Sequence, residues 1–130
     1  MTHIRIADAA RFLGVSDDTV RRWVNSGSLA STVDASGRKA IEGRELALFA
    51  QAQAGNHDLS GNTSSARNRM IGLVTAVTAD MVMAQVEMQC GPFRVVSLMS
   101  SEAVRELGLE VGSVAVAVIK STNVIIESPA

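Results

Sequence analysis

Hydroxyl and cationic side chains gather in two short segments that lie far apart in the sequence. The segment "SSARN" (64–68) stands just before an apolar run, and "KSTN" (120–123) follows another one. Sites for compact tetrahedral oxyanions use short charge-assisted hydrogen bonds from several directions, with one or two cations that offset the charge. Taken alone, the first segment is equally well explained as a solvated strand flank, and a turn such as the second is more often just a hairpin. Their joint occurrence is poorly explained in that way, and it indicates an oxyanion site.

A third polar segment, "SLMSSE" (97–102), lies where a strand pattern changes to a helical one. Ser100 or Ser101 is predicted to cap a short helix that ends at Gly108. The helix is expected to pack through its apolar residues Ala103, Val104 and Leu107. Helix N-termini also present free N–H groups to anions, so this cap is either purely structural or a further anion donor.

Signals for other kinds of chemistry are weak. The sequence contains no nucleophile–base pair, no metal triad and no glycine-rich phosphate loop, so we do not expect an enzyme. Cys90 is the only cysteine, which excludes an intramolecular disulfide. His3 and His57 have no metal-ligand spacing with it, and no side-chain metal site is expected.

The polar segments belong to a C-terminal part, residues 64–130, that is predicted to be all-β with one short helix. Alternation is clearest in "VMAQVEM" (82–88), where Val82, Ala84, Val86 and Met88 share one face. Strands are expected over residues 71–78, 82–88, 93–99, 113–120 and 123–127. Three strands, a helix and two further strands predict an OB-like five-stranded Greek-key β-barrel. Phe93 is its one aromatic residue, so this part lacks the stacking platforms that bind oligonucleotides.

The N-terminal part, residues 1–54, has helical periodicity instead. A first helix is expected to bury Ile6, Ala9, Ala10 and Leu13 and to end at Gly14. A second helix, capped by Ser16 and closed by Gly27, is expected to bury Val20, Trp23 and Val24. Two short helices joined by a tight glycine-containing turn are the helix-turn-helix arrangement, although such pairs also occur in many small proteins that do not bind DNA.

The rest of this part is predicted to complete a small core. The segment "DASGRKAI" (34–41) reads as a tight turn with Ser36 and Gly37 at its tip. A third helix over 43–54 is expected to contribute Leu46, Phe49 and Ala50. The fold class is therefore α+β with two domains.

Composition sets limits on how these parts work. Residues 55–63 are rich in Gly and Asn and read as a linker between domains 1–54 and 64–130. The net charge of −1 excludes a polycationic protein that coats nucleic acid, so any DNA contact must be focused. The longest apolar run, "VAVAVI" (114–119), is too short to cross a membrane, and we expect a cytoplasmic protein in a reducing compartment.

The N-terminal part resembles the winged helix-turn-helix of MerR-like and excisionase-like regulators. The likeness lies in "IADAARFLGVSDDTVRRWVNSGSLAS" and in "GRKAIEGREL", and covers about residues 3–53. It implies that a recognition helix and a basic hairpin wing face DNA through Ser16, Thr19, Arg21, Arg22, Arg38 and Lys39. The wing is less basic than in many members of that family.

The C-terminal part resembles the molbindin, or Mop-type TOBE, domain. The likeness lies in "SARNRMIGLVTAV", "MAQVEMQCGPFRVVSLMSSEAVRELGLEVGS" and "AVIKSTNVII". In that family the barrel assembles with copies of itself and binds molybdate or tungstate between subunits. Carried over to this chain, the resemblance implies an oxyanion site made by Ser65, Ala66, Arg67, Ser100, Lys120 and Ser121. The chain carries a single such domain, so complete sites would require a homo-oligomer.

Together the two resemblances imply a DNA-binding transcription regulator that senses molybdate or tungstate. The alternative is a storage or buffering protein for these oxyanions, in which the helical domain serves assembly. The small excess of basic residues in 1–56, seven Lys and Arg against six Asp and Glu, keeps that alternative open.

Overall fold

The computed structural model describes residues 2–54 and 64–129, and these form two compact units that are treated separately below. We call them the helical unit (2–54) and the β unit (64–129). The predicted linker, 55–63, lies outside the described residues.

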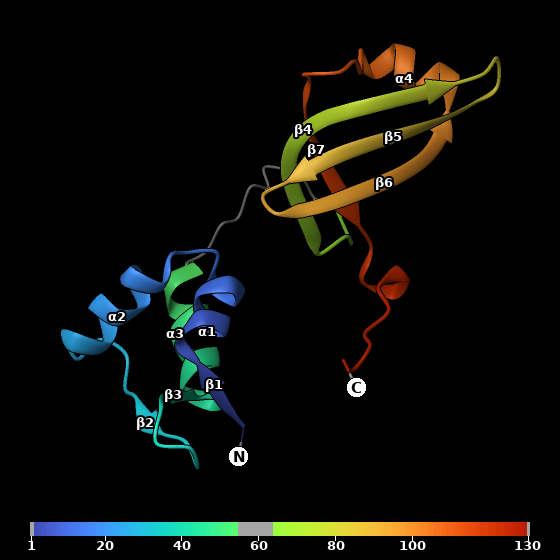
Figure 1. Ribbon diagram of the computed structural model, residues 1–130. Coiled ribbons are helices and arrows are strands. Elements are labelled where there is room, and N and C mark those ends of the chain that lie inside the picture. Colours follow the sequence, from blue (N-terminus) through green and yellow to red (C-terminus); the bar gives the residue numbers. More distant parts are fainter. Residues whose placement is uncertain (1, 55–63, 130) are drawn as a thin grey trace. The chain divides into compact units, whose positions relative to one another are not determined.

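The helical unit contains three helices and three short strands (Figure 1). In chain order they are β1 (His3–Arg5), α1 (Ile6–Leu13), α2 (Asp17–Asn25), β2 (Thr32–Val33), β3 (Lys39–Glu42) and α3 (Gly43–Ala54). Gly14 ends α1 in the left-handed conformation, with φ of 69°, as glycine does readily. The side-chain oxygen of Ser16 caps α2 by accepting a hydrogen bond from the backbone N–H of Thr19. The predicted three helices and both of these helix signals are thus confirmed.

The core of the helical unit is closed. Ala9, Val20 and Ile41 have no exposed surface. Trp23 and Phe49 pack against this core, and their ring centroids lie 4.9 Å apart. Strand β3 lies between β1 and β2 in an antiparallel sheet, in which Ile4 pairs with Ile41. Strand β1 was not expected from the sequence, because three residues are too few for a period of two to be visible.

The β unit is a curled antiparallel sheet with one helix (Figure 1). Its elements are β4 (Asn68–Ala79), β5 (Met83–Cys90), β6 (Phe93–Ser100), α4 (Ser101–Leu107), β7 (Val114–Ile119) and the 3-10 turn η1 (Ser121–Asn123). The strand order is β6-β5-β4-β7. The predicted α+β class and the OB-like sheet are confirmed.

The inner face of this sheet and α4 share one core. Its buried members are Val74, Ala84, Val86, Met88, Cys90 and Val104. Gly72 allows β4 and β5 to approach closely, because a Cβ there would lie 2.7 Å from the Cys90 Sγ. Ser100 caps α4 and Gly108 ends it in the left-handed conformation, as predicted.

Three expectations about the β unit are wrong. The fifth strand, 123–127, does not form: η1 covers its start and no regular structure follows in the described residues. Leu107, expected to pack, is 66% exposed. Val82, expected to share the face of Ala84, Val86 and Met88, is 70% exposed because Asp80 caps a turn there and the strand begins at Met83. The four strands thus leave the predicted five-stranded barrel one strand short.

Membrane-spanning segments were sought in the same residues. Within 2–54 and 64–129, no helix has the length and apolarity needed to cross a bilayer.

Candidate functional site

The β4–β7 ladder brings two of the three polar segments side by side. Asn68, the first residue of β4, pairs with Ile119, the last residue of β7. The Asn68 Nδ2 also donates a hydrogen bond of 3.2 Å to the Ile119 carbonyl oxygen. Arg67 directly precedes β4 and Lys120 directly follows β7. Their segments therefore emerge together at one end of the sheet.

The "SSARN" segment is folded on itself through Ser64. Its Oγ accepts a hydrogen bond of 3.1 Å from the Ala66 backbone N–H, and its carbonyl oxygen accepts one of 2.9 Å from the Arg67 Nη1. An oxyanion at this site would replace Ser64 as the acceptor for both donors. Ser64 was quoted within the motif but was not predicted to have a role.

The facing segment follows β7 directly. The Asn123 N–H donates to the Lys120 carbonyl oxygen at 2.9 Å, which forms the single turn η1. The side chains of Ser65, Arg67, Lys120 and Ser121 are exposed. None of the ion pairs found among residues 2–54 and 64–129 involves Arg67 or Lys120, so both charges face solvent and can meet an anion.

Ser100 lies at the opposite end of the sheet. It pairs with Met83, and the neighbouring Ala84 pairs with Ala79, which ends β4. Asn68 is at the other end of this twelve-residue strand. A single chain therefore groups five of the six predicted oxyanion residues and leaves Ser100 apart, where its Oγ caps α4 by accepting from the Ala103 N–H at 3.1 Å.

Arg69, the second arginine after Ser64, is not a solvated strand flank. It pairs with Val118, is half-buried, and its Nε is buried without a hydrogen-bond partner among the described residues. Its environment separates it from Arg67, whose side chain is exposed.

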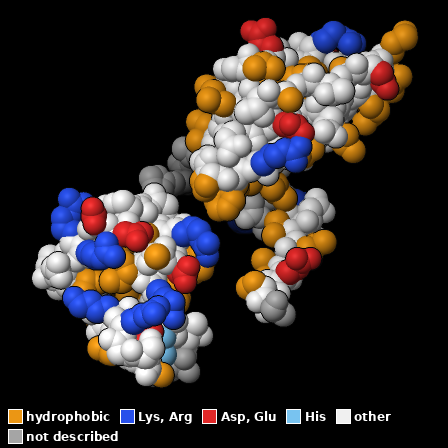
Figure 2. All heavy atoms as spheres, in the orientation of Figure 1, with side chains coloured by type: hydrophobic (Ala, Val, Ile, Leu, Met, Phe, Trp, Pro, Cys, Tyr) orange, Lys and Arg blue, Asp and Glu red, His pale blue; other side chains and the backbone are white. Residues whose placement is uncertain are grey.

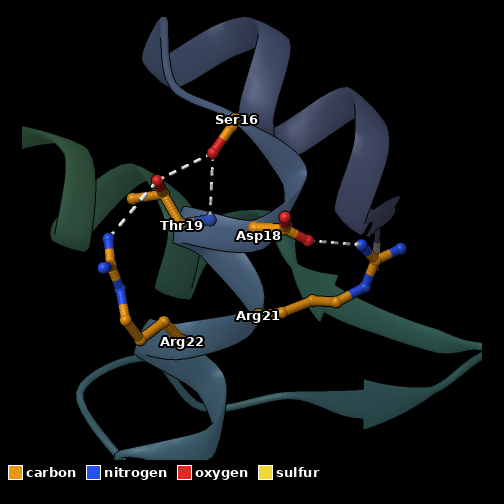
Figure 3. Close-up of polar contacts among 5 residues, drawn as sticks. All are labelled: Ser16, Asp18, Thr19, Arg21 and Arg22. Atoms are coloured by element: carbon orange, nitrogen blue, oxygen red, sulfur yellow. Dashed lines mark hydrogen bonds and ion pairs between the residues drawn. The ribbon is translucent and has the colours of Figure 1, made fainter.

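The predicted DNA-facing residues of α2 and its cap lie in two separate groups of polar contacts (Figure 3). The Ser16 Oγ and Thr19 Oγ1 are 2.9 Å apart, and the Arg22 Nη2 donates to that Thr19 oxygen at 3.5 Å. The Arg21 Nη1 lies 3.4 Å from the Asp18 Oδ1. Both arginines are exposed, so their guanidinium groups are available for phosphates or base edges.

The hairpin between β2 and β3 is organised by Asp34. Its Oδ1 accepts hydrogen bonds from the backbone N–H groups of Ser36 and Arg38 and from the Ser36 hydroxyl. These bonds, with that from the Ser36 side chain first, hold the pKa of Asp34 below its ordinary value of 3.8. The turn leaves Arg38 and Lys39 exposed on the hairpin, as expected for a wing.

Charge on the helical unit is mixed. Figure 2 shows Lys and Arg side chains over its visible face, interspersed with Asp and Glu. Asp17 and Asp18 occupy the first turn of α2. Within residues 2–54 and 64–129, no group of three or more His, Cys, Asp and Glu could hold a metal ion.

Comparison with known proteins gives separate matches for the helical unit and the β unit. Residues 4–54 match the model of a helix-turn-helix domain, and residues 64–126 match that of the TOBE domain. Molybdenum-pterin-binding protein 3 of Clostridium pasteurianum is 41% identical over 63 residues, which are 48% of this chain and 93% of that protein. The chain belongs to the molbindin family of TOBE domains. Molybdenum-pterin-binding protein 1 of the same organism is 38% identical over the same shares of both chains.

A solved relative of the molbindin domain agrees in fold. The structure of a molybdate-binding protein from Sporomusa ovata matches 52% of this chain and all of its own, with 24% identity and a TM-score of 0.50. At this identity the likeness concerns the fold alone.

Proposed function

We propose that this protein is a transcription regulator that binds DNA through its helical unit and senses molybdate or tungstate through its molbindin domain. The observation that carries the proposal is the Asn68–Ile119 register, which joins the Arg67 and Lys120 segments at one sheet end. The helix-turn-helix match and the molybdenum-binding relatives support its two halves.

The chemistry of the paired segments suits a tetrahedral dianion. The Arg67 guanidinium offers a planar set of N–H donors and the Lys120 ammonium a compact charge, so two cations offset two negative charges. The Ser65 and Ser121 hydroxyls and the Ala66 amide provide neutral donors from other directions. The anion would release Arg67 and the Ala66 amide from Ser64, which occupies them in the free chain.

Assembly follows from the position of Ser100. Because it lies at the far end of the sheet, its hydroxyl can reach this site only from another copy. We therefore propose a homo-oligomer with oxyanion sites between subunits. An oxyanion bound between copies favours one arrangement of protomers, and so can change the spacing of their recognition helices on DNA.

Isothermal titration of the full chain with molybdate, tungstate and sulfate tests the oxyanion half. We expect heat from molybdate or tungstate, and its loss when Arg67 and Lys120 are both replaced by Ala. Arg105→Ala is the matched control, because Arg105 is an exposed arginine on α4 and should leave the binding unchanged. Absence of heat with both metal oxyanions would refute the proposal.

A storage or buffering protein remains the second candidate, and one feature of α2 favours it. Asp17 and Asp18 place two carboxylates at the end of the helix that would approach DNA, and such charges repel phosphates. A gel shift with the DNA upstream of the protein's own gene separates the two functions. Specific, salt-sensitive retardation that Arg22→Ala abolishes supports the regulator, and its absence supports storage.

A further inference from the structure

The two exposed arginines of α2 have polar partners of different charge. The Arg22 Nη2 donates a hydrogen bond of 3.5 Å to the hydroxyl oxygen of Thr19. The Arg21 Nη1 lies 3.4 Å from the carboxylate oxygen Oδ1 of Asp18. Figure 3 shows the two guanidinium groups on different sides of the helix. Arg22 therefore keeps its full charge beside a neutral partner, whereas a carboxylate offsets the charge of Arg21.

Arg22 is held by a chain of hydroxyl groups that begins at the helix cap. The Thr19 Oγ1 lies 2.9 Å from the Ser16 Oγ, which also accepts the Thr19 backbone N–H at 3.2 Å. Because the Thr19 oxygen accepts from Arg22, its own hydrogen can be donated to Ser16, and every bond in the chain is then satisfied. Thr19 is half-buried and β-branched, so its hydroxyl has few alternative positions. Thr19 therefore restricts where the Arg22 guanidinium lies before DNA is bound.

A restricted guanidinium suits the edge of a base. The planar fork of arginine matches the O6 and N7 acceptors of guanine with two parallel hydrogen bonds, and this match depends on orientation. A phosphate contact needs charge but carries no sequence information. Thr19 uses one N–H of the Arg22 Nη2, and the other donors of the fork remain for guanine.

The Asp18–Arg21 pair suits a contact with phosphate that is deliberately weak. The Asp18 side chain is 95% exposed and that of Arg21 is 56% exposed. Exposed ion pairs contribute little to stability, so Arg21 can leave Asp18 for a phosphate. The carboxylate stays nearby and repels the phosphates of any DNA, so it lowers the part of the affinity that is independent of sequence.

We propose that Arg22, which Thr19 positions, reads a guanine in the major groove of DNA. Arg21 contacts phosphate alone, and its pairing with Asp18 lowers the affinity for DNA of every sequence. The family resemblance assigned both arginines the same DNA-facing role, whereas their partners separate them. This inference rests on the proposed function, since it concerns the DNA interface of the regulator.

The first test measures base preference by gel shift. The retarded fragment of the DNA upstream of the protein's own gene is prepared as a set of duplexes in which each base pair is replaced in turn. For the wild type we expect a G·C pair whose replacement weakens binding by roughly tenfold or more. Thr19→Val, which replaces the hydroxyl by a methyl group, and Arg22→Lys, which keeps the charge, should both lose this preference.

Two matched controls accompany these variants. Thr19→Ser keeps the hydroxyl and Arg21→Lys keeps the phosphate contact, so both should retain the preference for that G·C pair. Trp23 fluorescence checks that each variant is folded, because Trp23 packs on the core of the helical unit. Retention of the preference by Thr19→Val or Arg22→Lys, or its loss in Arg21→Lys, overturns the inference.

The second test concerns DNA of unrelated sequence. Asp18→Asn should strengthen binding to such a fragment, and should steepen the fall of log affinity with log salt by about 0.9, the value for one phosphate contact. Asp8→Asn is the matched control, because Asp8 forms the equivalent pair with Arg11 on α1, also at 3.4 Å, and should have a smaller effect. An Asp18→Asn protein with unchanged affinity for this fragment overturns the role of Asp18.

The outcomes separate this inference from the proposed function. A wild type that retards no DNA overturns both, since no base is then read. Specific retardation with a base preference that Thr19→Val leaves unchanged overturns the inference alone, and the regulator stands.

Discussion

The helical unit and the β unit differ in how far their apolar residues are buried. In the helical unit Ala9, Val20 and Ile41 are fully enclosed by the unit's own helices and strands. In the β unit an apolar groove stays open and Ile125 and Ile126 face solvent. Figure 2 shows hydrophobic side chains over the visible face of the β unit and along its C-terminal segment.

This difference bears on the homo-oligomer proposed above. The free energy gained by burying apolar surface is roughly 25 cal/mol per Å², so a closed core stabilises its own unit and an open one favours association. We expect the helical unit to be folded as a single copy and the β unit to reach its full stability only in the oligomer.

The largest effect is expected from a charge placed in the closed core. Val20→Asp should destabilise the helical unit by more than about 4 kcal/mol, because an unpaired carboxylate would be buried. Trp23 fluorescence would report unfolding, since Trp23 is the only tryptophan and packs on that core. Val33→Asp, at a position that is 63% exposed, should change little. If Val20→Asp also abolished the molybdate heat, the division into a self-sufficient and a dependent unit would be wrong.

A smaller loss is expected from crowding the β4–β5 contact. Gly72→Ala would force its new methyl group against the Gln89 carbonyl and the Cys90 Sγ, and should cost about 1–3 kcal/mol of β-unit stability. Differential scanning calorimetry measures the loss. Gly43→Ala, where the nearest contact would be an ordinary 3.4 Å, is the control in the helical unit. An unchanged β-unit transition would contradict the close approach of these strands.

Matched helix caps allow the two units to be compared directly. Ser16→Ala and Ser100→Ala each remove an oxygen that accepts a backbone N–H, and each should cost about 1 kcal/mol. We expect Ser16→Ala to shift the denaturation curve followed by Trp23 fluorescence, and Ser100→Ala to leave it in place. On the proposed function, only Ser100→Ala should also weaken molybdate binding in the titration. Equal effects on that binding would remove Ser100 from the site.

The smallest effect is expected on the stability of the β unit at low pH. Hydrogen bonds from the backbone N–H groups of Met83 and Val82 hold the pKa of Asp80 below its ordinary value of 3.8. A carboxyl with a depressed pKa in the folded state stabilises that state above the unfolded value, and the contribution is lost as the pH falls through the folded value. Asp80→Asn should therefore make β-unit stability less dependent on pH below about 4. A melting temperature that follows pH as in the wild type would exclude this role.

Much of this architecture could be predicted from local patterns. Helix caps depend only on residues that are neighbours in the sequence. Their positions at Gly14, Ser16, Ser100 and Gly108 could therefore be predicted without knowledge of the fold. The pairing of the Arg67 and Lys120 segments was predicted only through their joint occurrence and a family resemblance. Strand register, here Asn68 with Ile119, depends on contacts between distant residues.

The errors also have a physical pattern. Residues 123–127 have the composition of a strand, but a strand forms only where a neighbouring edge accepts its hydrogen bonds. Leu107 lies at a helical position typical of a core, yet its neighbours do not cover it in a single chain. In both cases the composition is that of a buried element, but no element of the described residues packs against it. The apolar character of these residues was recognised correctly, but the prediction that they are buried within the chain was wrong.

The turn η1 has a kinetic consequence. Lys120 precedes it, Ser121 begins it, and an exposed segment starts at Val124, directly after its end. On the proposed function, an oxyanion held by Lys120 and Ser121 of one copy and by Ser100 of another would hold the two copies together. Subunits labelled with different fluorophores should then exchange more slowly when molybdate is present. A protein built in this way would keep its partners, and its bound ligand, through dilution that would otherwise separate them.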